Sequence, residues 1–129
     1  MIPKVGDILS YKRVISQNEV FEFSKLSGDT NPLHFDTLFA SETRFESPII
    51  HGYFLSSLLS KIVGTMFGDK VLLLSQDSYY RNPAYTGDEL EVMCQVKRIQ
   101  KALNIIYLDS TISTQSVLIL NGSISFKIL

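Results

Sequence analysis

One segment near the middle of the chain constrains the fold most strongly. From Gly52 to Phe67 the apolar residues fall at helical spacing and form one broad stripe: Leu55, Leu58, Leu59, Ile62, Val63 and Met66. This pattern predicts the longest helix of the chain, with a wide face that other elements must cover. On the opposite side, small residues recur every four positions: Gly52, Ser56, Ser60 and Gly64. Such a ridge admits a ligand or another backbone close to the helix, although packing against a sheet would use the same pattern.

The chain after Gly68–Asp69 changes to the two-residue alternation that half-buried strands require. The alternation is clearest between Leu90 and Lys97, and turn residues mark breaks at Pro83, Gly87–Asp88 and Asn104. The predicted strands are Asp7–Val14, Val71–Tyr80, Leu90–Lys97, Ile105–Thr114 and Val117–Leu129. Long antiparallel strands after one long apolar helix predict an α+β domain in which the sheet covers the helix.

Length and composition exclude several classes of protein. At 129 residues the chain is expected to form a single domain over residues 1–129. Its 12 basic and 13 acidic residues form no long run, so nothing favours a nucleic-acid partner or an anionic membrane surface. No stretch approaches the roughly 18 apolar residues of a membrane helix, and a cytoplasmic location is expected. The lone Cys94 excludes an intrachain disulfide and is expected to be a small core residue.

Two helices are predicted around a polar loop in the first third of the chain. Ser16 and Glu19 have the spacing of a capping box, which opens the first helix, and Ser27–Gly28 is typical of its end. Asp36 or Thr37 can cap a short second helix. The loop between these helices is therefore anchored by a packed element.

This loop brings a carboxylate, an amide and an imidazole within six residues, as Asp29, Asn31 and His34. Gly28 and Pro32 prevent it from continuing as helix. Three such groups can together hold one water molecule and move its protons. The same residues are also common in simple turns, where the imidazole satisfies a local hydrogen bond. Spacing alone leaves both interpretations open.

A longer pattern includes this loop. The stretch SGDTNPLHFD, residues 27–36, followed by FESPIIHG, residues 45–52, resembles the signature of the MaoC-like (R)-specific enoyl-CoA hydratases, a hot-dog-fold family. The resemblance implies a curved antiparallel β-sheet wrapped around a long central α-helix. It also implies an enzyme, a hydro-lyase that interconverts trans-2-enoyl thioesters and (R)-3-hydroxyacyl thioesters in fatty acid metabolism.

The same resemblance assigns roles to individual residues. It makes Asp29 and His34 the catalytic pair, which jointly deprotonate water and supply a proton. It implies that Asn31 helps to position the water or the thioester, and that Ser60 is a supporting hydrogen-bonding residue near the catalytic histidine. The backbone N–H of Gly52, at the start of the central helix, is expected to stabilise the enolate oxygen. No cofactor and no metal is implied.

Some residues near these motifs have no clear assignment. His51 could form a metal site with His34 and Asp36, or could simply cap or orient the adjacent glycine turn; without a metal-binding spacing motif, we expect no metal. Tyr79 and Tyr80 could narrow a tunnel or simply fill the sheet, and packing is favoured because aromatic residues in strands are more often packing than ligand contacts. In SYYRNPAYTGDEL, residues 78–90, the side chains at 81, 82 and 85 replace positions that are commonly apolar or small in the family: Arg81, Asn82 and Tyr85.

The resemblance implies an acyl-CoA or acyl-carrier-protein thioester as the substrate. It further implies a homodimer whose sheets join edge to edge, with a larger assembly left open. One alternative is a dehydratase for carrier-protein thioesters or for a specialised pathway. An alternative from another class is a non-catalytic module that binds acyl thioesters, and loss of Asp29 or His34 would have favoured it. Thioester hydrolysis is less favoured, because the loop resembles the hydratase branch.

Overall fold

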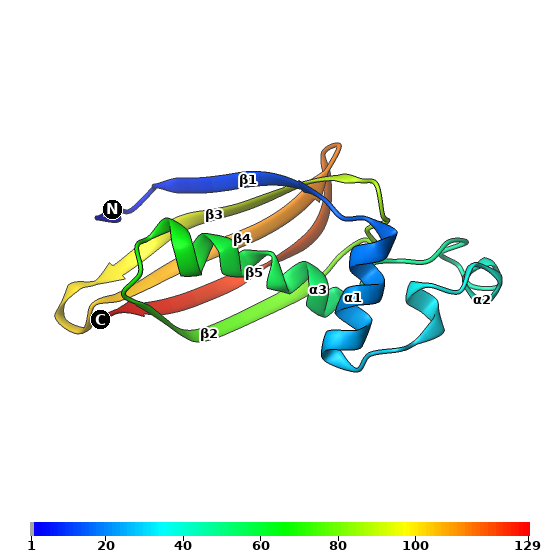
Figure 1. The fold of residues 1–129 in the computed structure, drawn as a ribbon. Coiled ribbons are helices and arrows are strands. Elements are labelled where there is room, and N and C mark those ends of the chain that lie inside the picture. The colour runs from blue at the N-terminus through cyan, green and yellow to red at the C-terminus, as the bar shows by residue number, and fades with distance from the viewer. Residues whose placement is uncertain (1) are drawn as a thin grey trace.

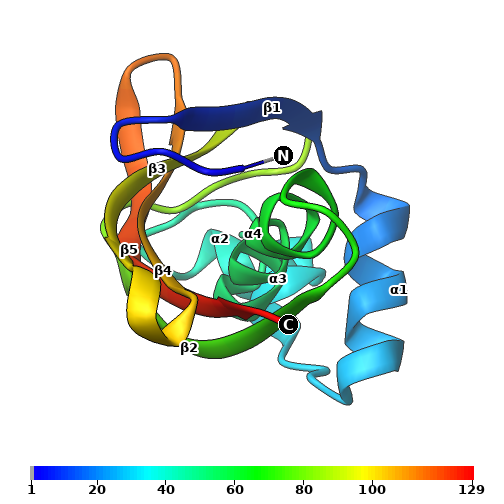
Figure 2. The ribbon, with the colours of Figure 1, turned by 90° about the vertical axis from the view of Figure 1, so that its left-hand side faces the viewer.

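The computed structural model describes residues 2–129, within which five antiparallel strands form one curved sheet around a helical rod (Figures 1 and 2). The order across the sheet is β1-β3-β4-β5-β2, so that β1 and β2 are its two edges. The strands are β1 (Ile8–Val14), β2 (Val71–Tyr80), β3 (Glu89–Gln100), β4 (Ile105–Thr114) and β5 (Val117–Ile128). The predicted α+β arrangement, in which the sheet covers the central helix, is confirmed.

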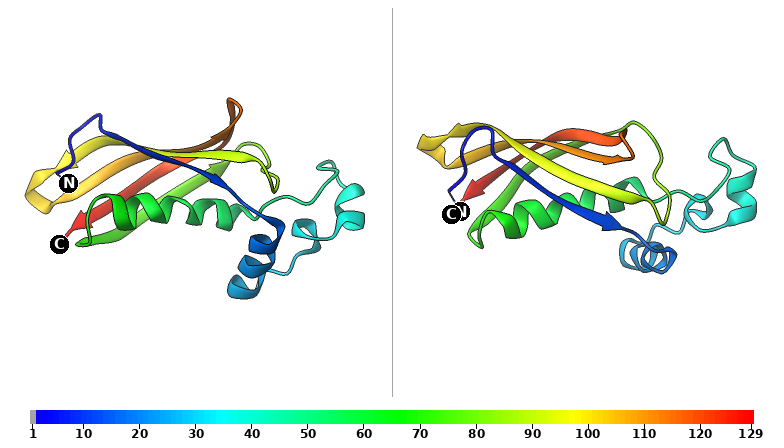
Figure 3. Two further views of the ribbon diagram at one scale, coloured as in Figure 1. Left: turned by 45° about the horizontal axis from the view of Figure 1, so that its top comes forward. Right: turned by 90° about the horizontal axis from the view of Figure 1, so that it is seen from above.

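The helical rod consists of three consecutive segments: α3 (Gly52–Ser57), α4 (Leu59–Lys61) and the π-helical η2 (Ile62–Met66). Two further views show it lying along the concave face of the sheet (Figure 3). The prediction of one long helix is thus confirmed in extent, but its last turn is π-helical. Gly64 lowers the helical propensity there, and the hydroxyl of Thr65 donates a hydrogen bond to the carbonyl of Lys61.

The core lies between the rod and the inner face of the sheet. The rod buries its apolar stripe, and β3 buries alternate side chains, as predicted. The buried residues of this core include Leu55, Leu59, Ile62, Val92, Val96, Leu108, Ile112 and Phe126. Cys94 belongs to the same core, where burial raises the pKa of its thiol to about 12. The thiol is therefore neutral and covered, which confirms its interpretation as a core residue.

Predicted and observed strands differ mainly in β3. It continues to Gln100, which pairs with Ile105 of β4 beyond a register shift between Val96 and Arg98. The shift puts the alternation of buried and exposed side chains out of phase, and the predicted strand therefore ended too early, at Lys97. Strands β2 and β4 have the predicted bounds.

The remaining helices lie at one end of the rod (Figure 1). They are α1 (Gln17–Ser27), the 3₁₀ turn η1 (Pro32–His34) and α2 (Thr37–Ser41). A second 3₁₀ turn, η3 (Lys101–Leu103), joins β3 to β4 at the opposite end of the molecule (Figure 1). The capping box of Ser16 and Glu19 forms as predicted, and Asp36 caps α2 by accepting the N–H of Phe39 at 3.0 Å. Within residues 2–129, no helix has both the length and the apolarity that a membrane crossing needs.

Candidate active site

The loop after α1 owes its shape to a series of local hydrogen bonds. Gly28 ends the helix with a φ of 81°, and its N–H bonds to the carbonyl of Ser24 at 2.9 Å. The Asp29 carboxylate then accepts the N–H of Asn31 at 3.2 Å, and Asn31 Oδ1 accepts the N–H of Leu33 at 3.0 Å. These hydrogen bonds between residues close in the sequence hold the carboxylate of Asp29 in a fixed orientation.

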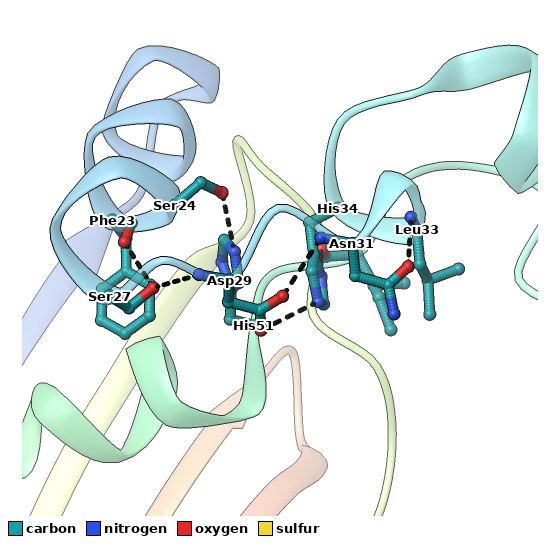
Figure 4. Close-up of polar contacts among 9 residues, drawn as sticks. Phe23, Ser24, Ser27, Asp29, Asn31, Leu33, His34 and His51 are labelled. Atoms are coloured by element: carbon teal, nitrogen blue, oxygen red, sulfur yellow. Dashed lines mark hydrogen bonds and ion pairs between the residues drawn. The ribbon is translucent and has the colours of Figure 1, made fainter.

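Asp29 and His34 face each other across a short gap (Figure 4). Asp29 Oδ2 lies 3.8 Å from His34 Nε2, while His34 Nδ1 lies 2.9 Å from the carbonyl oxygen of Ile49. A carbonyl only accepts, so Nδ1 carries a proton and donates it, and Nε2 is free to take or give one. The gap exceeds a hydrogen bond, and 42% of the Asp29 side chain is exposed, so a water molecule can contact both groups. The predicted pair is therefore brought together.

His51 lies directly behind His34. Its ring is 1% exposed and stacks on that of His34, with 3.9 Å between centroids and 27° between planes. Its Nε2 lies 3.0 Å from Ser24 Oγ, and the ring of Phe23 packs on it at 4.9 Å between centroids. The sequence offered no signal for Ser24, because the contact depends on how α1 docks beside the rod. These contacts fix the plane in which the His34 ring lies.

The alternative metal set of His51, His34 and Asp36 is not brought together in the described part of the chain. Asp36 caps α2, whereas ligand atoms of Asp29, His34 and His51 lie within 4.8 Å of one another. Even these three do not fit an ion, because two imidazoles that share a metal at about 2.0–2.1 Å direct their lone pairs to one point. Stacked, nearly parallel rings keep their lone pairs in two separate, nearly parallel planes instead, so the lone pairs do not meet at one point.

Burial, with the neighbouring charge of His34, lowers the pKa of His51 below its ordinary value of 6.5. Below pH 6.5 the unfolded chain therefore binds a proton that the folded chain does not, and stability falls as the pH falls toward the folded pKa. We expect the free energy of unfolding to drop between pH 7.5 and 5.5 less steeply in His51→Asn than in the wild type. Urea denaturation at both pH values measures this, and equal drops would contradict it.

Gly52 is the first residue of α3, and first-turn N–H groups have no partner inside a helix. The ring of Tyr80, from β2, covers it so closely that a Cβ on Gly52 would lie 3.0 Å from Tyr80 Cε1. The Tyr80 hydroxyl is held by Ser56 Oγ at 2.6 Å. A cavity of about 510 Å³ is lined by Asp29, Gly52, Tyr53, Gln76, Asp77, Ser78 and Tyr80. Tyr80, for which the sequence favoured packing over the narrowing of a tunnel, is thus a wall of this cavity.

In the described part of the chain, Ser60 does not lie beside either histidine. It lies two helical turns beyond Gly52, about 12 Å along the axis, and is exposed. It lines a second cavity, of about 360 Å³, which shares Tyr53 and Gln76 with the first. The serine that contacts a histidine is Ser24.

The chain is similar in sequence and in fold to several known proteins. The model of the family described as "MaoC like domain" matches residues 6–117. An (R)-specific enoyl-CoA hydratase of Aeromonas caviae is 35% identical over 113 residues, which are 87% of this chain and 84% of that protein. A mitochondrial 3-hydroxyacyl-[acyl-carrier-protein] dehydratase of Arabidopsis thaliana is 36% identical over 101 residues, and the match spans 78% of this chain but 60% of the plant protein. The solved structure of the (R)-hydratase from A. caviae superposes with a TM-score of 0.94 and 33% identity over 98% of both chains.

Proposed function

Because the chain belongs to the MaoC-like family and has its hot-dog fold, we propose that it is a hydro-lyase that interconverts trans-2-enoyl and (R)-3-hydroxyacyl thioesters. The observation that carries this proposal is the 3.8 Å separation of Asp29 Oδ2 and His34 Nε2, where Asp29 lines the same cavity as Gly52. Relatives named as hydratases and as dehydratases support the reaction in both directions.

Hydration adds the oxygen of water to C3 of the substrate and a proton to C2. The gap between Asp29 and His34 leaves room for one water molecule that would contact both groups. One member of the pair takes a proton from this water as its oxygen attacks C3, and the other gives a proton to C2. The pair therefore holds the same number of protons after the reaction, and a transfer between its two members restores the starting state. Dehydration is the same sequence in reverse.

The negative charge that develops on the thioester oxygen needs a fixed donor. The N–H of Gly52 suits this role, since Gly52 begins a helical run and lines the same cavity as Asp29. The Oδ1 of Asn31 is occupied by the N–H of Leu33, so its amide N–H groups are what it can offer to water or substrate. Ser60, in the adjoining cavity, supports bound acyl groups or water there and does not act on His34.

Strand β2 is the edge through which two copies would join. Its ten residues leave large apolar side chains about half exposed: Leu72, Leu73, Leu74, Tyr79 and Tyr80. The other edge, β1, carries Lys12 and Arg13, which protect an edge strand from pairing. A homodimer formed by β2 edges would also bring a second copy beside the cavity of Asp29, because Gln76 and Tyr80 belong to this strand.

The direct test is the loss of ultraviolet absorbance from the conjugated double bond of crotonyl-CoA. We expect turnover that yields (R)-3-hydroxybutyryl-CoA. The (S) product would contradict the proposed stereochemistry, and release of free thiol would show hydrolysis of the thioester. No turnover of either the CoA or a carrier-protein thioester would favour the non-catalytic binding module.

A further inference from the structure

A further opening, distinct from the cavity that Ser60 lines, adjoins the active-site cavity on the far side of Tyr80. This opening, of about 280 Å³, shares only Gly52 and Tyr80 with the cavity of Asp29. Its floor is apolar, with Ile50, Leu55 and Ala84 almost fully buried. The exposed members of its lining are Tyr80 and three polar residues: Arg44, Arg81 and Asn82.

Both guanidinium groups are held in place, but in the described part of the chain neither forms an ion pair with a carboxylate. The Arg44 guanidinium lies 4.8 Å from the ring centroid of Phe45, and that of Arg81 lies 5.2 Å from the centroid of Tyr79. Arg81 Nε also donates to Asn121 Oδ1 at 2.8 Å, which leaves its terminal N–H groups available. In the described part of the chain, the only arginine in an ion pair is Arg13.

Two of the three residues that depart from the family pattern line this opening, and the third forms a hydrogen bond to a residue of its lining. Arg81 and Asn82 line it, and the Asn82 side chain is fastened to the carbonyl of Leu118 at 2.7 Å. The Tyr85 hydroxyl donates to the carbonyl of Phe45 at 3.0 Å and so ties the loop of Arg44 to the segment that follows β2. These three residues thus help to fix two guanidinium groups, those of Arg44 and Arg81, at the rim of an apolar opening that reaches Gly52.

We propose that Arg44 and Arg81 bind the phosphate at the end of the pantetheine arm that carries the acyl group. This inference rests on the proposed function, because the thioester must lie at Gly52 for its arm to leave through the passage. The planar fork of a guanidinium matches two phosphate oxygens, and the apolar floor suits the gem-dimethyl part of pantetheine. The same phosphate ester is present in coenzyme A and in the phosphopantetheine of a carrier protein.

The test compares crotonyl thioesters of pantetheine, which has no phosphate, of 4′-phosphopantetheine and of coenzyme A. For the double variant Arg44→Gln/Arg81→Gln we expect KM to rise about tenfold or more with both phosphorylated substrates, at little change in kcat. With the pantetheine thioester we expect less than about a twofold change. The matched control is Arg98→Gln, another exposed arginine stacked on a tyrosine, 3.9 Å from the Tyr107 centroid, and it should alter none of these values.

An equal KM increase with all three substrates, or an effect confined to the coenzyme A thioester, would overturn the proposal. A crotonyl carrier protein then distinguishes the two sources of the phosphate, since the larger loss identifies the carrier whose arm the arginines hold. The wild type separates this inference from the function itself. If it hydrates none of the thioesters, the proposed function fails; if it hydrates them and the double variant behaves like the wild type, only the phosphate site fails.

Discussion

Asp29→Asn is expected to lower kcat for hydration of crotonyl-CoA by about 10²- to 10⁴-fold, because an amide cannot exchange a proton with water or with His34. The variant should remain folded, since an amide oxygen can still accept the N–H of Asn31 as the carboxylate does. His34→Gln should cause a loss of similar size by removing Nε2. Steady-state absorbance assays and circular dichroism measure activity and folding on the same samples.

The matched control is Asp36→Asn, another exposed acid of the same segment. Its carboxylate caps α2 through the N–H of Phe39, and asparagine caps helices about as well as aspartate. We expect wild-type kcat from this variant. The double variant Asp29→Asn/His34→Gln should be little slower than either single variant, since residues that act as a unit are not additive. Wild-type turnover in a folded Asp29 or His34 variant would refute the assignment of the pair.

Gly122→Ala is expected to cause the largest loss of stability among single-methyl changes. Gly122 lies in β5 opposite Ser78 of β2, and a Cβ there would stand 2.0 Å from the carbonyl oxygen of Asp77. Backbone cannot rotate away as a side chain can, so the two strands must separate. Overpacking costs typically about 1–3 kcal/mol and occasionally more, and we expect a cost at or above the upper limit.

Urea denaturation at pH 7.5 measures this cost, with Gly64→Ala as the control. A Cβ on Gly64 meets only Ser60 Oγ, at 4.0 Å, and alanine is the better helix former by about 1 kcal/mol. The control should therefore lose no stability. Because β2 carries Tyr80, the Gly122 variant should also lose activity when folded, as the wall over Gly52 shifts. Equal stability of the two variants would contradict the strand-contact argument.

Local sequence signals predicted the elements whose causes are local. The capping box of Ser16 and Glu19 and the left-handed Gly28 place α1 within a few residues, and strand-like runs bounded by turn residues place β2 and β4. The end of β3 escaped prediction because a register shift depends on the partner strand. The π turn of η2 escaped for a related reason, since the helical stripe has the same apolar residues in either type of helix.

The candidate chemical groups could be recognised from the amino-acid sequence: a carboxylate and an imidazole on one short loop, and a glycine at the start of a long helix. Their spacing along the chain is short enough for turns and caps to impose their order. The residues that surround these groups became visible in the folded structure alone. Ser24 contacts His51 because α1 docks beside the rod. Tyr80 covers Gly52 because β2 runs beside α3. Arg44 and Arg81 line the same opening because the hydroxyl of Tyr85 joins two segments that are distant in the sequence. Such contacts join residues far apart in the chain, and their formation depends on packing of the whole core, which no local pattern encodes.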